Sequence, residues 1–265
     1  MYRLNVIGCG KVGRALARLL GEKRLVTTIC MVSGSVHSAQ AARDFVGVGE
    51  IKATLSELPP ADLWMITVGD SRLLTISREL LNSGRVADDS VVFHCSGAVG
   101  SSVLAPLREQ GAVVGSAHPI RSFADPELAC ASFAGTYCAI EGDQRATTRL
   151  RQLFEALGAR TFEIPEESKT RCHAGHVMVS NYLVALLDIA RGVYETAGVP
   201  SDCIADFMVS LAQSTLENVR GLGTTAALTG PIVRGDIDIV KKQLDSLRQE
   251  DMTKAVSLAA PVYAL

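Results

Sequence analysis

The chain has 265 residues, of which 48% are hydrophobic and 20% charged, and its formal net charge is −2. This length suits one large domain or two smaller ones. The small net charge, the lack of a basic tract and the 5% aromatic content argue against a nucleic-acid partner. No long uninterrupted apolar stretch predicts a membrane span or a signal peptide, so we expect a cytoplasmic protein with no membrane partner. Seven scattered cysteines without a C-x-x-C pair are expected to be free thiols.

The strongest functional signal is the motif G-x-G-x-x-G at residues 8–13, which follows a short apolar run and precedes a predicted helix. In that setting Gly8 permits a tight turn, Gly10 lets a pyrophosphate approach the backbone, and Gly13 lets helix and strand pack closely. The unpaired N–H groups at the helix start favour an anionic group. The motif therefore predicts a dinucleotide site that includes Gly8, Gly10, Lys11, Val12 and Gly13.

Apolar runs that alternate with helical patterns predict parallel βαβ units in the first part of the chain. Strands are expected at Val26–Val32, Ala61–Val68, Ser90–Gly97, Ala112–His118, Thr136–Glu141 and Arg160–Ile164, and helices at Lys11–Leu20, Ser38–Phe45 and Ser71–Asn82. The predicted class is α/β, with an N-terminal Rossmann domain built on a doubly wound parallel sheet.

The pattern turns helical after Pro165. The predicted helices are Ser168–Ala197, Ser201–Arg220, Asp236–Leu247 and Glu250–Ala260, with a glycine-rich loop over 221–235. We therefore expect a dinucleotide-binding domain over residues 1–164 and an all-helical domain over residues 165–265.

The segment after the second strand bears on which dinucleotide is bound. NAD-binding Rossmann domains place an acidic residue there to hold the ribose hydroxyls. Here the segment contains Ser33 and Ser35 and no carboxylate, and Arg43 is the nearest strong cation. This absence of an acid favours NADP over NAD, although small residues could simply form a turn. Val68 and Ser96, which lie at the ends of later predicted strands, complete the predicted cofactor contacts.

Polar groups at other strand ends are candidates for contacts with the reacting groups. Asp70 is better explained as a helix cap than as a catalytic group. His94 and His118 could each orient a ligand, and each could equally be a satisfied structural residue.

The first long C-terminal helix carries a polar stripe on an otherwise apolar segment. Lys169, His173, His176 and Ser180 recur at helical spacing, and Asn181 lies about 100° from the stripe. A buried lysine or a histidine is a suitable proton donor for carbonyl reduction. The alternatives are a solvated helix face or a structural histidine. A metal site is improbable because no third ligand motif accompanies the two histidines.

The loop Leu228–Asp236 contains an arginine, Arg234, between glycines. Its guanidinium could hold a substrate carboxylate. It could instead pair with Asp236 or Asp238 and fix the loop.

Several segments together resemble a family of Rossmann-like oxidoreductases with a C-terminal helical domain of unknown function: the glycine motif, 94–97, 116–123, 173–183 and 229–236. That family is similar to the ketopantoate reductase, pyrroline-5-carboxylate reductase and β-hydroxyacid dehydrogenase group. The resemblance implies a helical domain like that of 6-phosphogluconate dehydrogenase, dimerisation through this domain, and a cleft between the domains. It also implies that a lysine at the start of this helix is the acid, with an asparagine further along the chain. Lys169 and Asn181 are the matching residues. Their separation of twelve residues is longer than the lysine–asparagine spacing of the β-hydroxyacid enzymes.

Together these features predict an NADP-dependent reductase that transfers hydride to a small 2-oxo acid such as ketopantoate. Lys169 or His173 would supply the proton, and Arg234 or Asn181 would hold the carboxylate, with Ser180 and His118 as further substrate contacts. Two other functions fit: reduction of a cyclic imine such as pyrroline-5-carboxylate, and NADP sensing without chemistry.

Overall fold

The computed structural model describes residues 1–249, which fall into two compact units. Unit 1 is Met1–Val177 and unit 2 begins at Met178. The expected domain boundary was the end of the last strand, whereas the division between units lies within the helical stretch that follows. The first turns of that stretch belong to unit 1 because Lys169 is buried there.

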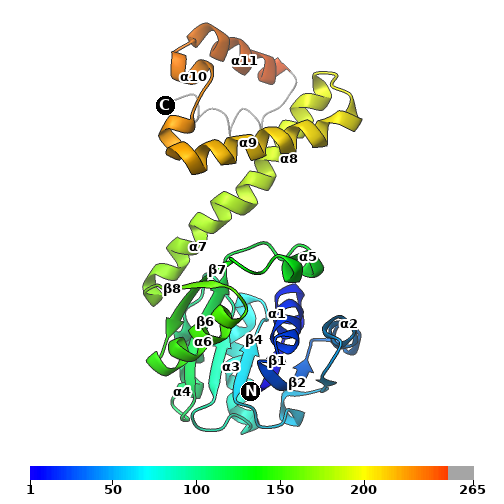
Figure 1. Cartoon of the computed structure of the whole chain (residues 1–265), viewed down its shortest axis with the longest axis vertical. Helices are drawn as coiled ribbons and strands as arrows, with labels where there is room; N and C mark the ends of the chain where they lie inside the picture. The colour runs from blue at the N-terminus through cyan, green and yellow to red at the C-terminus, as the bar shows by residue number, and fades with distance from the viewer. Residues whose placement is uncertain (250–265) are drawn as a thin grey trace. The chain divides into compact units, whose positions relative to one another are not determined.

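Unit 1 is built on one eight-stranded sheet in the order β3-β2-β1-β4-β5-β6-β7-β8 (Figure 1). The strands are β1 Tyr2–Ile7, β2 Val26–Val32, β3 Glu50–Ile51, β4 Leu63–Ile66, β5 Val91–His94, β6 Val113–Pro119, β7 Tyr137–Gly142 and β8 Arg160–Glu163. All neighbouring strands are parallel except β6 and β7. The register places Ile7 beside Ile66, Ile66 beside His94, and His94 beside Ser116, so several strands end along one edge.

Helices cover both faces of this sheet. The first face carries α1 Lys11–Glu22, α2 Val36–Val46, α5 Pro126–Ala131 and α6 Gln144–Ala156, and the second carries α3 Leu73–Ser83 and α4 Ala105–Arg108. Two separate clusters of buried apolar side chains follow from this arrangement, one against each face. This is the doubly wound arrangement that the alternating sequence pattern predicts.

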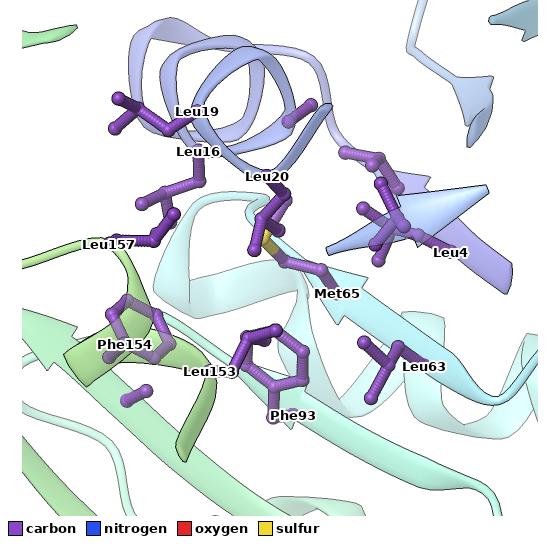
Figure 2. Packing of buried hydrophobic residues seen from close by; sticks show 14 of the residues in the cluster. Leu4, Leu16, Leu19, Leu20, Leu63, Met65, Phe93, Leu153, Phe154 and Leu157 are labelled. Atoms are coloured by element: carbon purple, nitrogen blue, oxygen red, sulfur yellow. The ribbon is translucent and has the colours of Figure 1, made fainter. Parts of the chain in front are cut away.

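The core of the first face is formed by α1, α6 and the central strands (Figure 2). Leu16 and Leu20 of α1 point toward the sheet, with Leu20 beside Met65 of β4, and Phe154 of α6 meets Phe93 of β5 edge to face, with ring centroids 6.4 Å apart. All five side chains are buried. The helix that begins at the glycine loop, α1, is thus fixed by apolar packing.

The Rossmann-like sheet and the helical C-terminal region are confirmed, with one departure in the sheet. β7 runs antiparallel to β6, because their connection carries only the six-residue helix α5, which packs on α1. A parallel neighbour would need a full crossover along the sheet. The short elements β3, α4 and α5 were not predicted, and neither was the longer α6.

The predicted helix Ser168–Ala197 is three consecutive segments: α7 Lys169–Val177, a π-helix Met178–Tyr182 and α8 Leu183–Thr196. Unit 2 continues with α9 Ser201–Ala227, α10 Pro231–Arg234 and α11 Ile237–Gln249. Gly223, with φ 78°, interrupts α9 soon after the predicted end at Arg220. The predicted helix over 250–260 lies outside the described residues.

The stretch Glu166–Thr196 is long and apolar enough to cross a membrane by length and composition alone, although the sequence predicted no span. Helices that pack against another protein surface share this composition. Within the described part of unit 2, Ile204 is the one buried apolar side chain.

Truncating the aromatic pair in the core tests the packing of the first face. We expect Phe154→Ala to lower the free energy of unfolding by about 3–5 kcal/mol, because Phe154 is 1% exposed and a cavity would remain. Urea denaturation measures this. Thr148→Ala, on the exposed side of the same helix, is the control and should change the value by less than about 1 kcal/mol. Similar losses in both variants would contradict the packing described here.

Candidate functional site

The glycine loop between β1 and α1 has the geometry that its motif predicts. Gly8 has φ +90°, and a Cβ there would lie 2.7 Å from Val68 Cγ1. A Cβ on Gly13 would collide with Gly8 O and Thr67 Oγ1, whose hydroxyl donates to the Gly8 carbonyl. Gly10 faces open space, and as the N-cap of α1 it has no side-chain cap. The loop therefore leaves the N-terminal N–H groups of α1 free for an anionic ligand.

A pocket of about 690 Å³ opens at this loop. Four predicted cofactor residues line it, Gly8, Gly10, Ser33 and Val68. Further lining residues come from the segments after β3 and β4 and from α3: Thr54, Ser56, Gly69, Arg72, Glu79 and Asn82. Pockets of this size hold small organic ligands and cofactors, and their usual place in open α/β sheets is outside the carboxyl ends of the strands.

The two serines after β2 are partly engaged with α2. The Ser35 hydroxyl caps this helix by accepting from the Ser38 N–H at 3.1 Å, and the Ser33 hydroxyl donates to Ser38 Oγ at 2.9 Å. Of the two, Ser33 lines the pocket. The part of the pocket next to β2 therefore has hydroxyl and backbone groups and no carboxylate from this segment.

The predicted proton donor Lys169 lies inside unit 1 and is 1% exposed. Its ammonium donates to the Ser96 carbonyl at 3.0 Å and to Ser116 Oγ at 2.6 Å, and lies 3.7 Å from Glu141 Oε1. Ser116 and Glu141 are cross-strand partners on β6 and β7. Through these contacts Lys169 attaches the start of α7 to β6, to β7 and to the turn that follows β5.

Burial lowers the pKa of Lys169, and the neighbouring Glu141 carboxylate opposes that shift. Glu141 is itself 5% exposed and accepts from the N–H and the hydroxyl of Ser101, at 2.9 and 2.7 Å. A buried charge is tolerated only when it is paired and hydrogen-bonded, and both members of this pair meet that condition.

Three imidazoles gather where α7 passes the ends of β5 and β6. The ring centroids of His118, His173 and His176 are 5.6 to 6.4 Å apart. His176 is the third residue of the predicted stripe. Its Nε2 is 3.6 Å from Cys172 Sγ, and its Nδ1 is buried without a hydrogen-bond partner. Within residues 1–249 no three His, Cys, Asp or Glu side chains are arranged to hold a metal ion.

The His118 ring has a defined tautomer. Its Nδ1 lies 3.3 Å from the Cys95 carbonyl, which can only accept, so Nδ1 carries the proton and Nε2 is the acceptor. Burial lowers the pKa of His118 to about 4, and nearby cationic groups add to the shift. His118 is therefore neutral at pH 7.

Gly97 makes this arrangement of rings possible. A Cβ at position 97 would lie 2.7 Å from His118 Nε2 and would collide with His173 Cδ2. The sequence singled out the segment 94–97 without a reason for its glycine. The reason is the close approach of two imidazoles to the backbone.

His118 also lines a smaller pocket of about 360 Å³, together with Lys11, Val12, Cys95 and Phe123. Lys11 and Val12 open α1 directly after the glycine loop. This pocket thus connects the start of α1, next to the glycine loop, with His118 of the imidazole cluster.

Three of the remaining predicted site residues, Ser180, Asn181 and Arg234, belong to unit 2. Ser180 and Asn181 are exposed within the π-helix, whose wider turn shifts Ser180 off the stripe that begins at Lys169. Arg234 pairs with Asp236, with its Nε 2.9 Å from Oδ2, which is the structural alternative for this arginine. Ser96 caps its own turn by accepting from the N–H groups of Ala98 and Val99.

Sequence reasoning missed the buried partners of Lys169 and the residues that line the far end of the pocket at the glycine loop. A carboxylate at the end of the apolar run 137–141 was the available signal for Glu141, because such a group needs a cationic partner. Arg72 and Glu79 gave no signal, since surface charges on a helix are common.

Family models match two parts of the chain. Residues 2–119 match a Rossmann-like domain, and residues 136–260 match a domain of unknown function, DUF2520. The combination of a Rossmann-like domain with a C-terminal domain of unknown function, predicted from the sequence motifs, is confirmed. A search of curated proteins found no significant match.

Solved structures share the fold over nearly the whole chain. A Bacteroides fragilis protein proposed to be an NADP oxidoreductase is 20% identical, with a TM-score of 0.81 over 99% of this chain and 97% of the other. A Thermotoga maritima protein is 23% identical, with a TM-score of 0.73 over 98% and 95%. A Coxiella burnetii pyrroline-5-carboxylate reductase is 13% identical, with a TM-score of 0.65 over 99% and 97%.

The neutral His94 ring gives stability a pH dependence. Its Nδ1 accepts from the Ser96 N–H and its Nε2 lies 3.2 Å from the Gly100 carbonyl, so protonation would break a bond and bury a charge. Burial lowers the pKa of His94 to about 4. An unfolded chain binds the proton near pH 6.5, so this contribution is complete above about pH 6.5 and is lost as the pH falls toward 4.

We therefore expect the free energy of unfolding to fall between pH 7 and pH 5, by at most about 1.4 kcal/mol per pH unit from this residue. His94→Gln should make the slope shallower in urea titrations at each pH. The control is His37→Gln on the exposed side of α2. An unchanged slope in His94→Gln would show that His94 is not buried as a neutral ring.

Proposed function

Because a Rossmann-like domain precedes the DUF2520 domain, we propose that this protein is an NADP-dependent oxidoreductase that reduces a small 2-oxo acid, such as ketopantoate. One observation carries the proposal. The glycine loop with its nucleotide pocket and the three imidazoles lie along one edge of the same sheet, joined by the pocket that Lys11 and His118 share. Open α/β sheets bind their ligands at this edge.

The residues around the glycine loop fit a dinucleotide. A Cβ would fill the space at Gly8 and Gly13, and Gly10 leaves the approach to the start of α1 open. The segment after β2 offers Ser33 and no acid, which favours the 2′-phosphate of NADP over the free ribose of NAD. When bound, the nicotinamide would supply the hydride.

His173 is the proposed proton donor to the substrate oxygen. His118 is neutral at pH 7 and presents its Nε2 as an acceptor, so it would orient a donor group rather than give a proton. Lys169 has its ammonium directed at three protein oxygens, so it would position α7 instead of reaching the substrate. Of the two proton donors that the sequence suggested, the lysine and the histidine, we therefore favour the histidine.

Reduction of a cyclic imine is the second candidate. Two pyrroline-5-carboxylate reductases share the fold, from Coxiella burnetii and Streptococcus pyogenes. A protonated imine already carries its proton, so a neutral acceptor such as His118 would be sufficient to orient it. The same site can thus serve either substrate class, and kinetics must decide between them.

We also propose that unit 2 forms a homodimer. Its described helices leave many apolar side chains exposed, among them Met178, Val179, Val184, Leu186, Leu211 and Leu216. Among the described residues of unit 2, one buried apolar side chain is too few to form a hydrophobic core. Exposed apolar surface of this kind marks an interface. A second copy of the chain presents the same surface and can cover it.

The reductase proposal predicts NADPH oxidation with a 2-oxo acid. A spectrophotometric panel should include ketopantoate, other 2-oxo acids and cyclic imines. With the best 2-oxo acid, His173→Asn should lower kcat about 100-fold or more, and the Kd for NADPH should stay unchanged, because a general acid is lost. Arg171→Gln, which is exposed on the same helix, is the control.

The panel also distinguishes the alternatives. Turnover of imines alone, with His173→Asn fully active, would favour the imine reductase. Retained NADPH binding without turnover of any substrate would leave a nucleotide-binding protein without chemistry.

The dimer proposal predicts that light scattering after gel filtration gives twice the mass of one chain. Leu186→Asp should yield monomers, because a carboxylate would be buried in the interface. Asp188→Ala on the same helix is the control and should leave the mass unchanged. A monomeric unmodified protein would contradict the proposal.

A further inference from the structure

The nucleotide pocket contains a cation that the sequence did not predict. Arg72 lies in the turn between β4 and α3 and lines the 690 Å³ pocket together with Ser33 and Gly34. The Arg72 side chain makes no hydrogen bond or ion pair with any other of residues 1–249. Its guanidinium therefore has its full set of donors available to a ligand.

The register of the sheet places this arginine opposite the segment after β2. β1 lies between β2 and β4, and Ile7 is level with Val32 on one side and Ile66 on the other. The segments that begin at Ser33 and Thr67 consequently flank the glycine loop from its two sides. A ribose beside Ser33, where NAD-binding domains place their acid, would share the pocket with Arg72.

The other basic residues near this pocket are less suitable. Lys52 is paired with Glu50 at 2.8 Å. Arg43, which the sequence suggested, belongs to the last turn of α2 and is not among the residues that line the pocket. The one lining carboxylate, Glu79, lies two helical turns beyond Arg72, about 10 Å along the axis of α3.

We infer that Arg72 binds the 2′-phosphate of NADP and is the residue that selects NADP over NAD. A guanidinium fork suits a phosphate dianion, because it forms paired, charge-assisted hydrogen bonds. The Ser33 hydroxyl donates its one hydrogen to Ser38 Oγ, so it can donate to the phosphate only if that bond is broken. The inference rests on the proposed function in one respect, that the pocket holds a nicotinamide dinucleotide.

The test measures binding without turnover, by titrating NADPH, NADH, 2′,5′-ADP and 5′-AMP. Arg72→Gln should weaken NADPH and 2′,5′-ADP about tenfold or more, and NADH and 5′-AMP by less than about twofold. Arg78→Gln is the matched control, because Arg78 is exposed on α3 and does not line the pocket. Thermal unfolding of each variant verifies that the protein remains folded.

Equal losses for the ligands with and without a 2′-phosphate, or no loss for any, would overturn the assignment of Arg72. That outcome leaves the reductase intact if NADPH is still oxidised. Conversely, tenfold weaker NADPH binding by Arg72→Gln together with no turnover of any substrate would remove the reductase and keep the phosphate contact. If the unmodified protein binds neither nucleotide, both proposals fail.

Discussion

The buried ammonium of Lys169 is the contact on which the arrangement of the site depends. It lies within 3.7 Å of oxygens from Ser96, Ser116 and Glu141, which belong to the turn after β5, to β6 and to β7. Removing such a charge from water costs several kcal/mol, and only the paired carboxylate and the hydrogen bonds offset this cost. Because these oxygens are held by the sheet and the turn after β5, they fix the position of the first turn of α7. His173 and His176 lie further along the same helix and are positioned with it.

Close packing determines how the other elements meet along this edge of the sheet. Gly97 leaves room for His118 and His173, and Gly13 leaves room for Thr67, so a side chain at either position would separate the elements that meet there. The pocket at the glycine loop and the imidazole cluster are thus two parts of one edge of the sheet. Apolar packing holds the strands and helices beneath them, and the buried pair of Lys169 and Glu141 holds the start of α7. This organisation explains how a reductase could bind its cofactor on the glycine loop and supply a proton from a helix that follows the sheet.

The sequence was sufficient for most of unit 1, because the motif at 8–13 and the alternation of strands and helices depend on local chemistry. It could not predict that β7 reverses direction, since both directions satisfy the same apolar pattern. It placed Lys169, His173 and Ser180 on one stripe, but the π-helix at Met178–Tyr182 breaks the period that this argument assumed. Arg72 could not be predicted because its neighbours in space lie across β1, far from it in the sequence.

The role of Lys169 as an anchor is tested most directly by a double-mutant cycle in unfolding. Lys169→Met and Glu141→Gln should each cost about 3 kcal/mol or more, because each leaves its buried partner unpaired. The double variant should cost less than the sum by about 1 kcal/mol or more, which is the signature of a direct interaction. Additive losses within about 0.5 kcal/mol would contradict the account and would leave Lys169 free to act as the proton donor.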